Sequence, residues 1–376
     1  MAVTPERGYL LLADLTGYTA YLSRGEIEHA PTIAGDLLET IVGRLEPPFR
    51  LAKFEGDAAF LYVENGRADG SLLLDAVEAA YLAFRRRLRS IEQASACDCT
   101  ACSQAPRLDL KFFLHHGEYV RTRIAGRDEL AGSSIIVVHR LLKGAAATAA
   151  HDADGRASGF VVLTTEAMAA MGLDPGALDA TEGSEEIEHL GTVRTRLLDL
   201  DRRWRSETER RRVDIEESRA FIDLRAVVPA EPATVWAYLT SPGLRPSWEG
   251  PIVITEVMDD GRRGVGTRSS CVTGRLATLE EIVDWQPYDH VAYRLAVPGL
   301  GAADATYDLA PDAGGTAVSV RWAAAGPDAV ETSLVDRLRR ERAEALARLT
   351  RILGPGLPQV MEAGIRMPER LEEGIA

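Results

Sequence analysis

Apolar strand-like runs alternate with amphipathic helix patterns over the first 200 residues. Residues 33–45 repeat apolar positions at helical spacing and end at two prolines, residues 73–91 show a longer pattern of the same kind, and a third covers 135–142. The strand-like runs read GYLLLAD, FRLAKF, AAFLYV, LDLKFFLHH, EYVRTRI, GFVVLT and TVRTRLLDL. This order of elements predicts an α+β sandwich with its helices on one face of a mainly antiparallel sheet.

The pattern changes at residues 201–218, DRRWRSETERRRVDIEES, which are almost wholly charged and carry no regular apolar stripe. We expect a solvated linker there, with a helix as one option. Beyond it FIDLRAVV alternates apolar with charged positions, as a half-buried strand does, and a short helix, several strands and a long helix over 334–352 follow. The predicted organisation is a domain over 1–200, the linker, a second domain over 219–355 and a loosely packed tail over 356–376.

Composition excludes several classes of protein. With 376 residues and 46% hydrophobic content, the chain can bury a core in each of two or three domains. Its formal charge of -14, from 57 acidic and 43 basic side chains, argues against a nucleic-acid or anionic-membrane binder, because phosphate binding needs clustered Lys and Arg. No apolar run approaches the roughly 20 residues of a membrane span, and the first residues lack a signal-peptide pattern. We expect a cytoplasmic protein without a membrane span.

Two carboxylates follow strand-like runs in the N-terminal half. Asp14 ends YLLLA, and Asp57 ends the turn of the hairpin LAKFEGDAAFLYV. If these segments are sheet neighbours, both carboxylates meet at one edge and suit Mg²⁺, which completes its shell with water and substrate phosphates. Gly17 allows backbone N–H groups to approach a phosphate closely, and Lys53 lies on the same hairpin as Asp57. The alternative is that Asp57 is a turn residue and Lys53 an edge-strand charge.

Four motifs resemble those of class III nucleotidyl cyclases and occur in that family's order. ADLTGYT at 13–19 and KFEGD at 53–57 are similar to its two main signatures, HHGEYV at 115–120 resembles its H-x-G-E strand turn, and LAGSSIIVVHRLLK at 130–143 resembles its glycine-led helix ending in Arg-Leu. The resemblance covers roughly residues 5 to 200. It implies a ferredoxin-like cyclase domain that binds a nucleoside triphosphate, with ATP favoured. It also implies a head-to-tail homodimer with active sites at the interface.

The same resemblance implies roles for individual residues. Asp14 and Asp57 would hold two Mg²⁺ or Mn²⁺ ions, assisted by the carbonyl of Leu15. Arg140, from the other protomer, would stabilise charge on the transferring phosphoryl group. The implied nucleotide contacts are the backbone of Gly17, Tyr18 and Thr19 for phosphate, and the side chains of Lys53 and Glu129 for adenine.

The sequence departs from the cyclase pattern at three positions. Ile136 stands where the family has an asparagine that orients the ribose, and an alkyl group makes no hydrogen bond. Loss of one preorganised polar contact of this kind costs on the order of 10² to 10³ in turnover. Glu129 stands in place of Asp or Thr, and Arg194 or Arg196 would have to replace a phosphate-binding lysine. An adenylate cyclase and a catalytically inactive scaffold on the same fold therefore both stay open.

Three cysteines lie close together in a polar loop, in the run CDCTAC. Cys97, Cys99 and Cys102 can reach one soft metal ion, with His115 or His116 as a fourth ligand, since Zn²⁺ favours tetrahedral sets of sulfur and nitrogen. Their spacing differs from that of a paired C-x₂-C knuckle. Reduced thiols and a redox disulfide are the alternatives.

Residues 219–355 resemble the START-like, helix-grip superfamily of polyketide cyclases and lipid-transport proteins, through the helix entry PAEPATVW and the strand end WQP. The resemblance implies a curved antiparallel sheet around the terminal helix, with an apolar cavity between them for a hydrophobic small molecule. Four tryptophans line that cavity or form plain core, namely Trp236, Trp248, Trp285 and Trp322.

Three interpretations of the whole chain follow. The leading one is a signalling protein whose cyclase-like domain binds Mg-ATP, forms cyclic AMP and is regulated by a hydrophobic ligand of the START-like domain. In the second, the cyclase fold has lost turnover and serves as a nucleotide-binding or dimerising scaffold. In the third, the C-terminal domain is a lipid or polyketide carrier or a hydrolase-like enzyme that the N-terminal half regulates.

Overall fold

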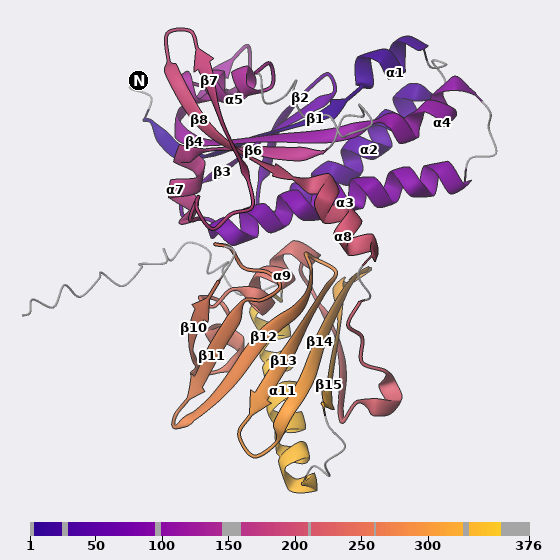
Figure 1. The fold of residues 1–376 in the computed structure, drawn as a ribbon, viewed down its shortest axis with the longest axis vertical. Coiled ribbons are helices and arrows are strands. Elements are labelled where there is room, and N and C mark those ends of the chain that lie inside the picture. The colour runs from indigo at the N-terminus through magenta and orange to yellow at the C-terminus, as the bar shows by residue number, and fades with distance from the viewer. Residues whose placement is uncertain are drawn as a thin grey trace, which may run out of the picture.

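The chain forms two α+β domains that pack against each other (Figure 1). A computed structural model describes residues 4–24, 29–94, 99–144, 159–209, 212–258, 261–325 and 331–354. The predicted α+β class is confirmed, whereas the predicted tail over 356–376 lies outside the described residues. Within the described ranges no helix combines the length and the apolar character that a bilayer crossing requires.

The N-terminal sheet has eight strands in the order β2-β3-β1-β4-β6-β8-β7, with β5 paired to β4. All pairs are antiparallel except β4 with β6. The strands are β1 (Glu6–Thr16), β2 (Arg50–Glu55), β3 (Ala58–Glu64), β4 (Asp109–Ile124), β5 (Arg127–Ala131), β6 (Phe160–Thr164), β7 (Thr181–Ile187) and β8 (Gly191–Asp199). Strand β1 lies between β3 and β4, so residues at its end can meet side chains from both neighbours.

Helices cover both faces of this sheet, because β1 is apolar on both. Leu11 and Ala13 pack with the core under α2 and α3, whereas Leu10 and Leu12 pack with α5 on the opposite face. The expectation that all helices lie on one face is therefore wrong for α5. The helices of this domain are α1 (Tyr18–Arg24), α2 (Ala30–Leu45), α3 (Gly70–Ala94), α4 (Thr100–Gln104), the 3-10 turn η1 (Ala105–Arg107), α5 (Ser133–Leu141) and α7 (Thr165–Met171).

Strand β4 runs unbroken through the HHGEYV motif, where the sequence predicts a turn between two strands. Residues 109–124 form one strand that pairs with β1 in continuous register. Gly117 has another reason to be glycine, since a Cβ there would lie 2.2 Å from Oγ of Ser134 at the start of α5. The glycine thus permits a close helix-to-strand approach instead of a chain reversal.

The C-terminal sheet has seven strands in the antiparallel order β10-β11-β12-β13-β14-β15-β9, so its first and last strands in sequence are neighbours. The helix α11 packs against this sheet through a stripe of Leu334, Ala345, Leu346 and Leu349 (Figure 1). The elements are β9 (Ile222–Val228), α9 (Pro232–Thr240), α10 (Arg245–Glu249), β10 (Val253–Val257), β11 (Arg268–Thr273), β12 (Leu276–Gln286), β13 (His290–Val297), β14 (Gly301–Asp312), β15 (Gly315–Ala324) and α11 (Thr332–Ile352). A sheet packed on a long terminal helix is the predicted helix-grip arrangement, which is confirmed.

A charged cluster lies between α10, α11 and the sheet, where the START-like resemblance implies an apolar cavity. Arg245 makes two hydrogen bonds to Glu280 at 2.7 and 3.0 Å, and one to Glu249 at 2.5 Å. Arg342 of α11 binds the other oxygen of Glu249 at 2.9 Å and lies over the ring of Trp322. Burial alone would raise the pKa of Glu249, but the two guanidinium groups outweigh it and lower that pKa to about 2. Paired charges therefore occupy this part of the interior.

The linker predicted to be solvated contains a packed helix, α8 (Leu200–Glu209). Trp204 is buried, and the guanidinium of Arg89 from α3 lies 5.0 Å from its ring centre. Arg203 donates to the backbone carbonyl of Trp285 at 3.0 Å, so α8 contacts both domains. Two buried apolar side chains, Trp204 and Ile215, thus lie within this mostly charged run.

One buried carboxylate joins the two domains. Asp75 in α3 is fully buried and accepts hydrogen bonds from the indole N–H groups of Trp236 (3.0 Å) and Trp285 (3.1 Å) in the C-terminal domain. Burial raises the pKa of Asp75 to about 7, although the hydrogen bond from Trp236 opposes the rise. These two tryptophans therefore belong to the domain interface, and Trp248 and Trp322 are buried as well.

Ion pairs surround this contact. Arg262 of the C-terminal domain binds the buried Glu78 of α3 at 2.6 Å. Asp289, in the turn between β12 and β13, pairs with Arg44 at 3.1 Å and with Arg86 at 2.5 Å. These charged pairs add contacts between the second domain and the helices α2 and α3.

Replacement of Asp75 should weaken the interface and remove part of its pH dependence. Asp75→Ala leaves two buried indole N–H groups without an acceptor, which costs on the order of 1–3 kcal/mol each in the free energy of unfolding. Because the folded pKa of about 7 exceeds the ordinary value of 3.8, the stabilising contribution of Asp75 is complete below the ordinary value and is lost as pH rises through about 7. Urea unfolding followed by tryptophan fluorescence should show a larger loss below about pH 5 than above about pH 8.

The matched control is Glu92→Ala, at an exposed position of the same helix. It should leave the free energy of unfolding within about 0.5 kcal/mol of the parent. An Asp75→Ala protein as stable as this control would contradict the role given to the carboxylate.

Candidate functional site

Asp14 and Asp57 lie together in a pocket at one edge of the N-terminal sheet. Asp14 pairs with Ala58 across β1 and β3, and the backbone N–H of Leu15 donates to the backbone carbonyl of Asp57 at 3.2 Å, which ties the β2–β3 turn to the end of β1. The pocket has a volume of about 380 Å³. Its lining residues are Asp14, Leu15, Thr16, Gly17, Tyr18, Thr19, Ala20, Asp57, Lys111 and Leu142. Six residues that the sequence assigns to metal or phosphate are among them.

The two carboxylates repel each other. Burial raises the pKa of Asp14 to about 6, and the negative charge of Asp57 adds to the rise. Lys111, which faces Asp14 across β1 and β4, opposes it. The pocket therefore holds more negative charge than its own lysine balances, and a cation would relieve the excess.

Lys111 is a pocket residue that motif reasoning misses. It is buried, its ammonium lies 5.3 Å from the ring centre of Phe160, and burial lowers its pKa. The sequence does contain an indication of this residue, because in LDLKFFLHH one lysine interrupts a strand that is otherwise apolar over its central positions. Its contact with Asp14 depends on the β1–β4 register, which the sequence does not reveal.

The loop after Asp14 turns sharply into α1. Gly17 has φ of +88°, a left-handed conformation that side-chain-bearing residues rarely adopt. Gly17 and Thr19 are exposed at the pocket mouth, and the backbone carbonyl of Gly17 accepts the first helical hydrogen bond, from Tyr21. The exposed backbone here is accessible to a bound anion.

A second group of polar side chains surrounds Lys53. Its ammonium donates to Glu129 at 3.0 Å and lies 3.2 Å from Glu55, although Lys53 and Glu129 are far apart in sequence. His139 of α5 bonds the other oxygen of Glu55 at 2.7 Å. The structure thus brings the two predicted base-reading residues together, and it adds Glu55 and His139, which the motifs did not single out.

Arg140 and Ile136 lie one turn apart on the exposed side of α5. The side chain of Ile136 is 51% exposed, and Arg140 is exposed too. Neither residue, nor Lys53 or Glu129, lines the pocket of Asp14. Within one chain the predicted site residues therefore form separate groups.

Of the two arginines considered for phosphate binding, Arg196 pairs with Glu182 at 2.6 Å and Arg194 is exposed on β8.

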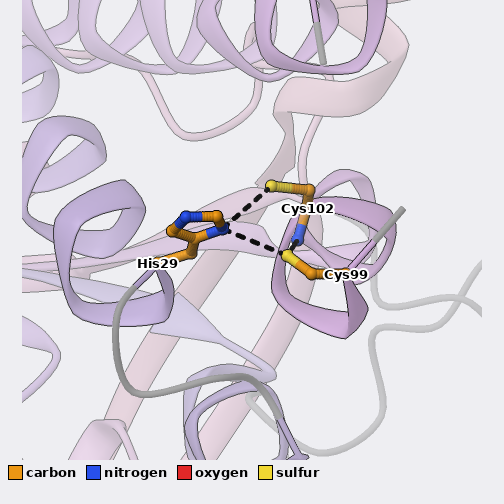
Figure 2. Close-up of side chains that lie close together, drawn as sticks. All are labelled: His29, Cys99 and Cys102. Carbon is orange, nitrogen blue, oxygen red and sulfur yellow. Dashed lines mark hydrogen bonds between the residues drawn. The ribbon is translucent and has the colours of Figure 1, made fainter. Parts of the chain in front are cut away.

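Two of the three clustered cysteines face a histidine that the sequence analysis did not consider. Nδ1 of His29 lies 3.2 Å from Sγ of Cys99 and 3.8 Å from Sγ of Cys102 (Figure 2). Cys97 lies outside the described residues.

The histidines suggested as a fourth ligand lie elsewhere. His115 bonds the hydroxyl of Thr164 at 3.0 Å inside the domain, where burial lowers its pKa to about 4. His116 packs against the ring of Tyr9. Both side chains are buried, and because they are successive residues of the unbroken strand β4 they point to opposite faces of the sheet.

The acidic pocket fits a hard divalent cation. Its donors are carboxylate oxygens, which Mg²⁺ and Mn²⁺ prefer, and its volume of about 380 Å³ leaves space for phosphate and water. The pKa of Asp14 is raised first by burial and then by the negative charge of Asp57, and a bound cation would oppose both effects. Asp14 and Asp57 would hold such an ion.

Two family models match parts of the chain. Residues 34–150 match a protein family of unknown function, DUF2652, and residues 212–354 match the family described as polyketide cyclase / dehydrase and lipid transport. The second match confirms the START-like resemblance of the C-terminal domain. An uncharacterized protein of Mycobacterium tuberculosis is 37% identical over 107 residues, which is 28% of this chain and 50% of the relative. The chain thus spans about half the length of the curated relative that it matches.

Solved structures resemble each half of the chain. The adenylyl cyclase CyaB from P. aeruginosa is 12% identical with a TM-score of 0.39, covering 53% of this chain and 97% of its own. The guanylyl cyclase Cya2 is 13% identical with a TM-score of 0.38, covering 52% and 93%. Protein CV1439 from Chromobacterium violaceum is 21% identical with a TM-score of 0.30, covering 36% and 97%. These likenesses concern the fold alone.

Metal binding at the acidic pocket should depend on pH through Asp14. A divalent ion requires the ionised carboxylate, so the affinity for Mn²⁺ should rise about tenfold per pH unit below about pH 6 and level off above it. Because the folded pKa of Asp14 is raised, its contribution to the stability of the metal-free protein is lost as pH rises through about 6. Asp14→Asn should therefore abolish Mn²⁺ binding and raise Tm at neutral pH.

Isothermal titration calorimetry and thermal unfolding measure the two effects. Asp128→Asn, at an exposed position of β5, is the control and should change neither. A flat dependence of Mn²⁺ affinity on pH, or an Asp14→Asn protein with unchanged affinity, would show that the ion binds elsewhere.

Proposed function

We propose that the N-terminal domain binds a nucleoside triphosphate together with Mg²⁺ or Mn²⁺, with ATP preferred, and that the protein is a nucleotide-dependent signalling protein. The observation that carries this proposal is the shared pocket of Asp14, Asp57 and the Gly17–Thr19 loop. Divalent ions bound there would neutralise the triphosphate and lower the pKa of a ribose hydroxyl. The protein's own part is to supply carboxylates for the ions and exposed backbone for the phosphates.

The preference for ATP rests on the group around Lys53. The ammonium of Lys53 can donate to a ring nitrogen of adenine, and the carboxylate of Glu129 can accept from its amino group. The two side chains already bond each other at 3.0 Å, which keeps a donor and an acceptor side by side. Guanine presents a carbonyl oxygen where adenine has its amino group, and that oxygen would face the Glu129 carboxylate unfavourably.

The complete site requires a second copy of the chain. The residues of the acidic pocket and those of the Lys53 group do not line one cavity in a single chain. A head-to-tail dimer would place the Lys53, Glu129 and Arg140 of one protomer opposite the acidic pocket of its partner. Arg140 would then face the phosphates, where its guanidinium stabilises negative charge.

Ile136 favours nucleotide binding over rapid turnover. It lies on the same exposed side of α5 as Arg140 and offers no hydrogen bond to a ribose. A ribose held less firmly reacts more slowly, because catalysis depends on the alignment of the reacting hydroxyl. The proposed protein is therefore a nucleotide sensor or scaffold with weak cyclase activity.

The C-terminal domain would regulate this site through an apolar ligand at the domain interface. A cavity of about 430 Å³ lies between the domains, lined on one side by Pro48, Phe49 and Leu72 and on the other by Ala237, Tyr238 and Tyr288. This volume suits a small apolar molecule. A ligand there would contact both domains and so bias how α3 and α9 pack.

The nucleotide proposal predicts that ATP binding depends on Asp57. Calorimetric titration with a non-hydrolysable ATP analogue and Mn²⁺ should show binding that Asp57→Asn weakens by at least about 100-fold, because one of the two carboxylates proposed to hold the ion is lost. The control Asp128→Asn should bind normally. Binding that is equal in Asp57→Asn and the parent would contradict the proposal.

A variant at Ile136 tests whether this residue limits cyclase turnover in a protein that still binds the nucleotide. Ile136→Asn restores an amide at the exposed turn and should raise cyclic AMP formation by on the order of 10² to 10³, whereas Ile136→Ala should not. Unchanged turnover in Ile136→Asn would mean that another feature limits the chemistry.

The interface ligand should be detectable by native mass spectrometry of the full-length chain. An apolar molecule should copurify with the parent and be lost from Ala237→Trp, in which the new indole fills the cavity. Ala277→Trp, at an exposed position of β12, should retain it. The same occupancy in both variants would place the ligand elsewhere, and an empty parent would remove the basis for this regulation.

A further inference from the structure

His29, Cys99 and Cys102 converge in the N-terminal domain, and none of them lines the acidic pocket. His29 precedes α2, while Cys99 and Cys102 lie at the start of α4. Figure 2 shows one ring nitrogen of His29 directed toward both sulfurs. The three candidate ligand atoms all lie within 4.8 Å of one another.

The separations match those of ligands on one tetrahedral ion. A Zn²⁺ ion with Zn–S of about 2.3 Å and Zn–N of about 2.0 Å holds a sulfur and a nitrogen about 3.5 Å apart. The two Nδ1–Sγ distances, 3.2 and 3.8 Å, lie on either side of this value. Small side-chain rotations would therefore suffice to bind an ion between the three atoms.

The local fold fixes the direction of both thiols. Cys99 is the N-cap of α4 and its sulfur accepts a hydrogen bond from the backbone N–H of Cys102 at 3.4 Å. A spacing of three residues places both sulfurs on the same side of the first helical turn. Their histidine partner is 70 positions away in sequence from Cys99, so the contact joins two separate segments.

We propose that His29, Cys99 and Cys102 bind a structural zinc ion. Two thiolates and an imidazole form a soft ligand set that favours Zn²⁺ over Mg²⁺ or Ca²⁺, and a water molecule or a further donor completes the tetrahedron. This site is chemically distinct from the acidic pocket, which offers oxygen ligands. It therefore does not depend on the proposed nucleotide function.

The ion would brace the helices next to the acidic pocket. It would join the segment before α2 to the start of α4, and α1 contacts both of these helices. Helix α1 begins at Tyr18, directly after Gly17 of the pocket loop. Zinc would thereby limit the movement of the helix that follows this loop.

The metal content of the purified full-length chain tests the proposal. Mass spectrometry of the metals should find one zinc ion per chain, and X-ray absorption should show sulfur neighbours at about 2.3 Å and nitrogen or oxygen at about 2.0 Å. Removal of the ion with a chelator should lower Tm, and added ZnCl₂ should restore it whereas MgCl₂ should not. This comparison uses the unaltered protein and needs no variant.

Variants then assign the ligands. His29→Gln and the double variant Cys99→Ser/Cys102→Ser should each weaken zinc binding by more than roughly 100-fold, since loss of a direct ligand exceeds the 10- to 100-fold effect of an outer contact. Cys271→Ser, in the C-terminal domain, removes a cysteine outside the site and should keep full zinc.

Two outcomes would overturn the site. One is zinc content or affinity in the His29 and double-cysteine variants equal to that of the Cys271→Ser control. The other is a parent protein that takes up no zinc and instead shows a Cys99–Cys102 disulfide in non-reducing peptide mapping, which would make the pair a redox couple.

Discussion

The burial of one carboxylate in α3 sets the relation between the two domains. Water cannot reach Asp75 where α3 is packed between the two domains, so the carboxylate needs hydrogen-bond donors from the neighbouring domain. Trp236 and Trp285 each supply one indole N–H as a donor. The free energy of placing an acid there is recovered only when the second domain is in position. The C-terminal domain is therefore part of the environment that α3 requires, and a change in its packing reaches the N-terminal sheet through this helix.

Much of the fold can be predicted from periodicity, and the exceptions have physical causes. The patterns at 33–45 and 73–91 correspond to α2 and α3, because their apolar stripes face one core. Strand β7 was not predicted, since an edge strand with polar residues on most positions shows no alternation. The sequence predicts a turn at Gly117, which is wrong. This position requires glycine because Ser134 approaches it closely, and that tertiary contact is not visible in the sequence. A glycine in a turn and a glycine required by close packing look alike in the sequence.

The residues of the candidate site likewise fall into those that the sequence predicts and those that it misses. Asp14 and Asp57 are predicted because each ends a strand-like run within its own short motif, whereas the pairing of β1 with β3 that brings them together is a tertiary feature. Lys111 and His29 are missed because each meets its partners through sheet register or helix packing over a long separation. The Lys53 and Glu129 pair was assigned only through resemblance to a family, and its hydrogen bond is a consequence of β2 and β5 meeting near α5.

Among the described residues, the C-terminal domain packs on the side of the N-terminal sheet opposite to the proposed dimer face. That domain contacts α3, on one face of the N-terminal sheet, whereas α5 covers the opposite face. His139 of α5 bonds Glu55, which lies beside Lys53, so the second group of site residues lies on the α5 side. A partner protomer can therefore approach α5 without displacing the C-terminal domain. Regulation would then have to pass through the sheet itself, from α3 on one face to α5 on the other, and β1, β3, β4 and β6 each carry side chains that pack on both faces.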